Sequence, residues 1–125
     1  MPSYKAVEGH KNVIFSKAKA INYKNQRQLH ISFIIRGTKM GLNCFLDCKP
    51  DNELLNQFLK KPLPHNLDRH EHELFAEFIN REYVEISFTV ASSFNPKTRF
   101  NDVISIKPKD DLPCFTEYLE ERRDV

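Results

Sequence analysis

Lysine, arginine and aromatic side chains occur together at several places in this chain. Lysine and arginine attract phosphate groups, and the faces of aromatic rings stack on nucleic-acid bases at about 1–3 kcal/mol per base. Both kinds of side chain on wet strands or loops are typical of a surface that binds a polyanion. The candidate residues for this chemistry are Lys17, Lys19, Tyr23, Lys24, Arg27, Arg36, Lys39, Phe94, Lys97 and Arg99. His30 and Phe33 are further stacking candidates, although a phenylalanine on a strand more often belongs to the core.

Three histidines and two cysteines are of the types that bind zinc. They are His65, His70, His72, Cys44 and Cys48. Their spacing argues against a zinc site. His70 and His72 would lie on different faces of a helix, and Cys44 and Cys48 would be ~13 Å apart along a strand.

The residues for catalysis are also missing. None of the three cysteines is flanked by the sequence signature of an activated nucleophile. Paired carboxylates such as Glu71 and Glu73 are typical of a solvated helix start rather than of a general acid and base. The three glycines are too few for a dinucleotide fingerprint or a phosphate loop. We therefore expect a protein that is not an enzyme and has neither a cofactor nor a metal.

The 125 residues favour a single domain, and 40% of them are hydrophobic, enough for a core that needs no disulfide. An odd number of cysteines is typical of a reducing compartment. No apolar run approaches the length of a membrane helix, and the first five residues lack an apolar signal core. We expect a cytoplasmic protein that does not bind membranes.

Charge is divided unequally along the chain. Residues 1–50 contain nine Lys or Arg and two acids, whereas residues 51–125 contain ten Lys or Arg and fifteen acids. Six of those acids lie in residues 110–125. The first half would attract a polyanion, and the acidic end would shield that surface or recruit a basic partner. The alternative is that these charges only solvate a surface.

Hydrophobic periodicity predicts two hairpins separated by helices. The expected elements are strands over 11–21, 29–34, 40–48, 83–90 and 100–107, helices after a cap at Asp51 or Asn52 and near 68–81, and one or two helical turns over 116–122. Residues 36–39 are expected to form a turn and residues 92–99 a turn or open loop.

This order of elements predicts a mainly β fold with some α structure. We expect a five-stranded OB-like barrel over residues 1–108 with a helical insertion at about 51–81, between the third and fourth strands. An α+β mixed sheet is the alternative. Residues 109–125 would form an acidic C-terminal tail.

Three segments carry a family resemblance: the turn Arg36-Gly37-Thr38-Lys39, the closing hairpin from 84–90 to 100–108, and the acidic stretch Asp110–Phe115. Over residues 11–108 the chain resembles small OB-fold single-stranded-DNA-binding proteins of phages and mobile elements. The resemblance implies sequence-tolerant binding of single-stranded DNA in replication or recombination.

The same resemblance implies that the acidic end docks a replication or recombination protein. The residues that would do so are Asp110, Asp111, Pro113 and Phe115. The chain departs from the family pattern here, because Cys114 separates the proline from the phenylalanine and ten residues follow Phe115.

Three alternatives stay open. The strand bound could be RNA, an exposed hairpin edge could pair two copies into a homodimer, and the chain could instead be a protein-interaction module or an inhibitor of a host protein. Nucleic-acid binding requires Tyr23, Phe94 and the cations of the first half to converge on one face, whereas scattered cations would favour the interaction module.

Overall fold

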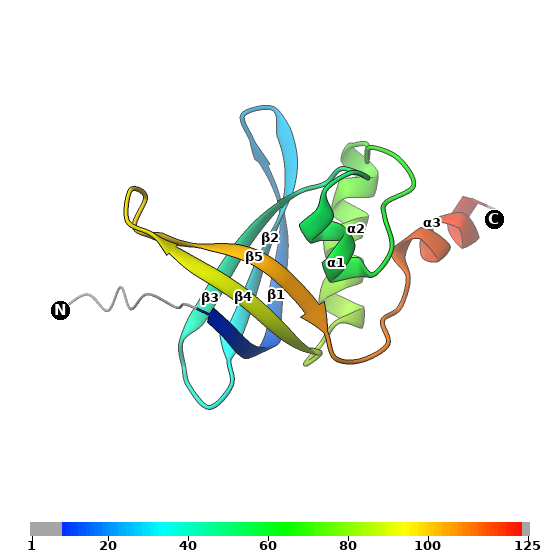
Figure 1. Ribbon diagram of the computed structural model, residues 1–125. Coiled ribbons are helices and arrows are strands. Elements are labelled where there is room, and N and C mark those ends of the chain that lie inside the picture. The colour runs from blue at the N-terminus through cyan, green and yellow to red at the C-terminus, as the bar shows by residue number, and fades with distance from the viewer. Residues whose placement is uncertain (1–8, 124–125) are drawn as a thin grey trace.

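The computed structural model describes residues 9–123 as a five-stranded antiparallel sheet with three helices (Figure 1). The elements in chain order are β1 (Gly9–Tyr23), β2 (Gln26–Ile35), β3 (Gly41–Asp47), α1 (Glu53–Leu59), α2 (Arg69–Glu82), β4 (Ser87–Asn95), β5 (Phe100–Pro108) and α3 (Phe115–Arg123). The mainly β class and the helical insertion between the third and fourth strands are confirmed.

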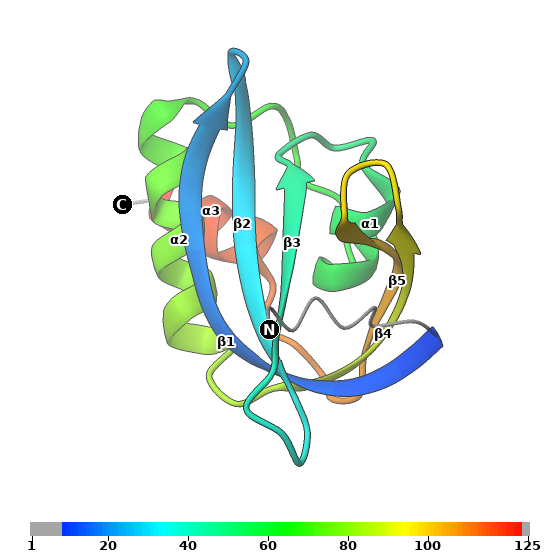
Figure 2. The same ribbon diagram turned by 90° about the vertical axis from the view of Figure 1, so that its left-hand side faces the viewer.

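The first strand organises the sheet, whose order is β3-β2-β1-β4-β5. Its first part, Gly9–Ile14, pairs with β4, and Val13–Tyr23 pairs with β2. The register with β2 shifts between Phe15 and Lys17, so Ser16 is the extra residue of a bulge. Bulges bend a strand and increase its twist, and β1 curves from one pairing partner to the other (Figure 2).

The sheet is not closed, so the expected barrel is not confirmed. Strands β3 and β5 form the two ends of the strand order, and α1 contacts both of them. On the β5 edge the Ile106 N–H donates to Gln57 Oε1 of α1 at 2.8 Å. A backbone donor that could extend the ladder from β5 is therefore taken by a helix side chain.

Local sequence signals position the first two helices. The Asn52 side chain accepts a hydrogen bond from the Leu55 N–H at the start of α1. At α2, Asp68 Oδ1 accepts from the Glu71 N–H at 2.8 Å, and Glu71 Oε1 accepts from the Asp68 N–H at 3.1 Å. This reciprocal pair is a capping box. Of the two residues predicted as caps of the first helix, Asp51 or Asn52, Asn52 is the cap, and α2 starts where a helix near 68–81 was expected.

Strand β4 starts later than predicted. Tyr83 continues from α2, with its N–H bonded to the Ile79 carbonyl at 2.9 Å. Glu85 has a φ of 58°, which no regular strand residue adopts. The predicted strand over 83–90 therefore begins only at Ser87, and the chain stays extended to Asn95, where a loop was expected.

An aromatic cluster fills the space between the sheet and the helices. Phe58 of α1 lies against Phe88 at a ring-centroid distance of 5.2 Å and against Tyr83 at 5.0 Å. Phe15 and Phe33 close the cluster from the sheet side, and all five rings are buried. The core therefore depends on contacts between elements that are distant in sequence.

Helix α2 is attached to the edge of β1 that no strand covers. Asn80 Oδ1 accepts from the Ala18 N–H and Asn80 Nδ2 donates to the Ala18 carbonyl, both at 2.7 Å. Further along, His72 Nε2 donates to the Gln28 carbonyl at 2.8 Å. Asn80 thus takes the place of a neighbouring strand at β1, and His72 adds a second attachment of α2, to β2.

The segment predicted to be an acidic tail contributes to the core. Phe115 is buried, with its ring centroid 4.6 Å from Phe75 and 5.4 Å from Phe78, and Leu119 is buried beside it. Helix α3 therefore packs on α2. Glu117, Glu120, Glu121 and Arg122 of α3 remain exposed, on the helical side of the molecule (Figure 1).

Candidate nucleic-acid interface

Strands β1, β2 and β3 present one face to solvent, which we call the outer face. Its rows of directly opposed residues include Lys19–His30–Phe45. Side chains alternate between the two faces of a strand. The neighbouring Ala18, Ile31, Cys44 row is accordingly buried. Figure 2 looks onto the outer face, with the helices behind or beside the strands.

Phe45 and His30 form a stacked pair at the centre of the outer face. Their ring centroids are 4.4 Å apart and their planes differ by 13°. Phe45 is nevertheless 56% exposed. Asn43 Oδ1 accepts from His30 Nε2 and from the Ser32 hydroxyl, each at 3.1 Å. These contacts fix the two rings, and each ring covers one face of the other, so a base would stack on the face of Phe45 turned away from His30.

Cations lie beside the Phe45–His30 pair. Lys19 is opposite His30 and Lys17 is opposite Ser32, and both lysines are exposed. Alternation along β1 places Tyr23 on the same face, where it is 57% exposed with Lys24 Nζ 5.3 Å from its ring centroid. Lys17, Lys19 and Tyr23 thus share the outer face, and the fourth predicted residue here, Lys24, lies beside Tyr23.

Negative charge is nearly absent from these strands. Asp47 is the one acid in residues 9–47, which contain seven Lys or Arg. Its Oδ1 accepts from Gln28 Nε2 at 2.7 Å. Helices α2 and α3 together contain seven glutamates. The charge asymmetry of the sequence therefore becomes a difference between the sheet side and the helical side of the fold.

The β4–β5 hairpin projects on the same side of the molecule as the outer face (Figures 1 and 2). Lys97 and Arg99 are exposed in its turn. Phe94 lies on β4 opposite Asn101 and is half-buried. Phe94 is thus a strand residue at the end of the hairpin, whereas the sequence suggested a loop.

Other predicted residues lie elsewhere. Arg27 is paired with Asn22, on the face opposite to Tyr23. Arg36 Nη2 donates to the Ser87 hydroxyl at 2.7 Å, and Lys39 is in the β2–β3 turn, at the far end of β2 from Lys24. Phe33 is fully buried and is not available for stacking.

The predicted partner-docking residues are divided between surface and core. Asp110 and Asp111 are exposed and Pro113 is half-buried. Phe115 is the first residue of α3 and its ring lies against α2, with 3% of its surface exposed. A partner could contact its ring only if α3 left α2.

Sequence reasoning missed Phe45, although a signal for it was present. The buried side of β3 consists of Leu42, Cys44 and Leu46. Phe45 therefore lies on the other side of the strand, together with the polar residues Asn43 and Asp47. A large aromatic residue on the polar side of a strand is a candidate binding residue.

The histidines and cysteines have structural roles. His65 Nε2 lies 3.0 Å from both carboxylate oxygens of Glu71, and His72 is bonded to β2. Among residues 9–123 no three His, Cys, Asp or Glu side chains are grouped so that they could hold a metal ion. Burial raises the pKa of the Cys44 thiol to about 12. For Cys48, burial and then the Asp47 carboxylate raise the pKa to about 12, so both thiols are poor nucleophiles.

These raised thiol pKa values predict alkaline destabilisation. In the unfolded chain the thiols would ionise near their ordinary value of 9.0, whereas in the fold they stay protonated to about 12. Their contribution is fully present below pH 9 and is lost as the pH rises toward 12. Each thiol should lower the unfolding free energy by at most about 1.4 kcal/mol per pH unit in that range.

Urea unfolding at pH 8, 9 and 10 measures this effect. The free energy of unfolding should decline more steeply with pH for the wild type than for a Cys44→Ala, Cys48→Ala double variant. Parallel declines would contradict the prediction.

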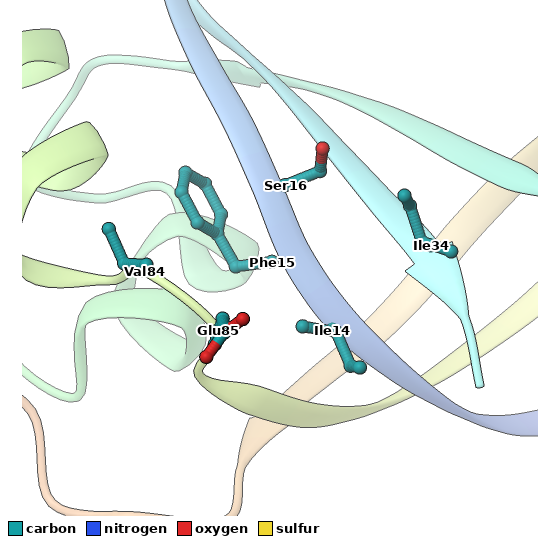
Figure 3. Close-up of a pocket in the computed structure, with 6 residues that line it drawn as sticks. All are labelled: Ile14, Phe15, Ser16, Ile34, Val84 and Glu85. Atoms are coloured by element: carbon teal, nitrogen blue, oxygen red, sulfur yellow. The ribbon is translucent and has the colours of Figure 1, made fainter.

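A second feature of the outer face is an open apolar hollow of about 310 Å³ at the bend of β1 (Figure 3). It is lined by Ile14, Phe15, Ser16, Ile34, Val84 and Glu85. Ile14 and Ile34 are opposite each other on β1 and β2, and Val84, on the segment between α2 and β4, is 61% exposed.

No protein-family model, curated protein or solved structure matches the chain. Across residues 9–123, every helix is too short or too polar to cross a membrane.

Proposed function

We propose that this protein binds single-stranded nucleic acid, with single-stranded DNA as the principal ligand and little preference for base sequence. The observation that carries the proposal is the exposed Phe45–His30 pair beside Lys17 and Lys19. Bases of any kind stack on such rings, while the lysines attract the phosphates. The resemblance to single-stranded-DNA-binding proteins of phages and mobile elements implies an activity in replication or recombination.

The position of the pair supports this proposal. In OB folds the face of strands 2 and 3, together with the loops between strands 1 and 2 and between strands 4 and 5, binds oligonucleotides. Here Phe45 and His30 lie on β3 and β2, Tyr23 is at the β1–β2 turn, and the β4–β5 hairpin projects on the same side. We accordingly propose that the sheet is an open variant of the OB fold.

The arrangement favours a single strand over a duplex, because the bases of a duplex are stacked on one another and hide their faces. In the stacked pair, the face of Phe45 turned away from His30 is left for a base, and Tyr23 offers a second exposed ring on the same face of the sheet. The half-buried Phe94 would add a third contact at the β4–β5 hairpin. Stacking on these rings is sequence-tolerant since every base has a π-face.

The test is a fluorescence-anisotropy titration of labelled oligo-dT, as single strand and as duplex with oligo-dA, at several salt concentrations. We expect preference for the single strand and a linear fall of log affinity with log salt. For Lys17→Gln, Lys19→Gln the slope should decrease in magnitude by about 1.4, or about 0.7 for each lost phosphate contact.

A matched control removes two lysines from the helical side, with Lys60→Gln and Lys61→Gln. That variant should keep the wild-type slope. Equal loss in both double variants would indicate attraction by net charge alone. Absence of binding at micromolar protein and low salt would reject the proposal.

The second candidate is a protein-interaction module, and the apolar hollow at Ile14, Ile34 and Val84 favours it. Val84→Glu should leave oligonucleotide binding unchanged if the hollow serves another purpose. A chain that fails to bind any oligonucleotide would make this hollow the first surface to test with a protein partner.

A further inference from the structure

The tip of the β1–β2 hairpin has a hollow to which Asn22 and Arg27 contribute from the face opposite Tyr23. Lys24 contributes from the turn, where its Nζ is also 5.3 Å from the Tyr23 ring centroid. The hollow has a volume of about 480 Å³ and is lined by Asn22, Lys24, Asn25 and Arg27. Two cations and two side-chain amides therefore surround it, and none of the lining residues is acidic. Such a lining, with two cations and no acid, favours an anion.

The backbone of the hairpin sets this arrangement. Lys24 and Asn25 form a two-residue turn with φ values of 49° and 64° between the paired Tyr23 and Gln26. Positive φ at both central residues is the type I′ turn that suits a twisted hairpin. The next pair, Asn22 and Arg27, then points to the face opposite Tyr23.

Arg27 is held in place but lacks a counter-ion. Its carbonyl accepts from the Cys48 N–H at 2.9 Å and from Gln26 Nε2 at 3.1 Å, so its backbone is anchored to β3 and to the hairpin. Its side chain is partly buried, yet no acid among residues 9–123 forms an ion pair with it. A partly buried charge of this kind is stabilised when an anion binds.

We propose that this hollow binds a terminal phosphate monoester of the nucleic-acid strand, an inference that rests on the proposed function. A terminal phosphate carries about −1.5 to −2 charges near neutral pH, whereas an internal phosphodiester carries one. Two cations and the fork of an arginine match the dianion. A strand lying on the outer face reaches Tyr23 at the end of β1, and its end turns around the hairpin tip into the hollow.

The test compares oligo-dT strands of one length with 5′-phosphate or 5′-hydroxyl ends, labelled at the 3′ end, and with 3′-phosphate or 3′-hydroxyl ends, labelled at the 5′ end. We expect the phosphate at one of the two ends to tighten binding by about tenfold. The gain should disappear in Arg27→Gln and in Lys24→Gln. It should persist in Lys39→Gln, which removes an exposed cation at the other end of β2.

Arg27→Gln could weaken the fold because Arg27 is partly buried, so its thermal unfolding is measured alongside. Lys24 is exposed, and its variant therefore tests the hollow without that complication. Equal affinity of phosphorylated and hydroxyl strands for the wild type would overturn the inference while leaving the proposed function in place.

A separate readout applies if no oligonucleotide binds. Thymidine monophosphate and thymidine are then titrated while the side-chain amide signals of Asn22 and Asn25 are followed by NMR. Shifts with the monophosphate alone would support the hollow as a phosphate site even though the proposed function had failed. The same shifts with the monophosphate and with thymidine, or no shifts with either, would overturn the inference.

Discussion

Phe58→Ala is expected to lower the free energy of unfolding by about 3–5 kcal/mol, the usual range for a buried phenylalanine. Phe58 is fully buried and its ring meets Phe15, Phe33, Tyr83 and Phe88, which come from four different segments. No neighbouring side chain can fill the space that its ring leaves, because the surrounding rings are held by separate elements. Urea unfolding followed by circular dichroism measures the change.

The effect should extend beyond the lost contacts. Helix α1 has seven residues, fewer than an isolated helix needs to persist in water. It therefore depends on Phe58, Leu55 and Leu59 for its position. Since α1 contacts both β3 and β5, its loosening would uncover the two edges of the sheet.

Leu54→Ala is the matched control, because Leu54 is on the same helix and is only partly buried. It should lower the unfolding free energy by less than half as much. A loss for Phe58→Ala no greater than that of Leu54→Ala would mean that Phe58 is not the centre of the core. Phe58→Leu should fall between the two, since it keeps part of the buried volume.

Phe45→Ala is expected to weaken single-stranded DNA binding by about 5- to 150-fold, which corresponds to the 1–3 kcal/mol of one stacked base. Phe45 is more than half exposed and sits outside the core, so the fold should tolerate the change. Phe45→Trp should keep the affinity because it preserves a flat ring. Anisotropy titration at fixed salt, with thermal unfolding as a second measurement, separates the loss of binding from the loss of structure.

Ile104→Ala provides the control for exposed hydrophobic area. Ile104 lies on β5, at the irregularity of its pairing with β4, and is 62% exposed. Its replacement should leave affinity unchanged. Equal losses in Phe45→Ala and Ile104→Ala would indicate non-specific adhesion, and an unchanged affinity for Phe45→Ala would remove the stacking surface from the proposal.

His30 would contribute to binding of the strand in a different way from Phe45. Its Nε2 bonds to Asn43 and its ring stacks on Phe45, so His30 supports one face of the Phe45 ring. The binding face is therefore organised before the strand arrives, and little side-chain entropy remains to be lost on binding. Lys17 and Lys19, on the neighbouring strand, keep their ammonium groups in solvent.

The sequence by itself determined the features that depend on neighbouring residues. Alternation identified the sheet strands and most of their buried side chains, and the capping residues Asn52 and Asp68 located two helix starts. The uneven charge was also a property of the sequence alone. These features were predictable because periodicity and caps act within a few residues of chain.

Only the tertiary structure decided how those elements meet. The five strands do not close into a barrel, α1 contacts both end strands, β3 and β5, and Gln57 bonds a strand about fifty residues away. Phe33 and Phe45 are both phenylalanines on strands, yet the first is in the core and the second is in solvent, because register and packing assign their faces. Arg27 and Tyr23, four residues apart, lie on opposite sides of one hairpin because a two-residue turn and the alternation of the strands separate them. Alternation therefore indicates which residues share a face, whereas which face becomes the core depends on contacts between distant segments.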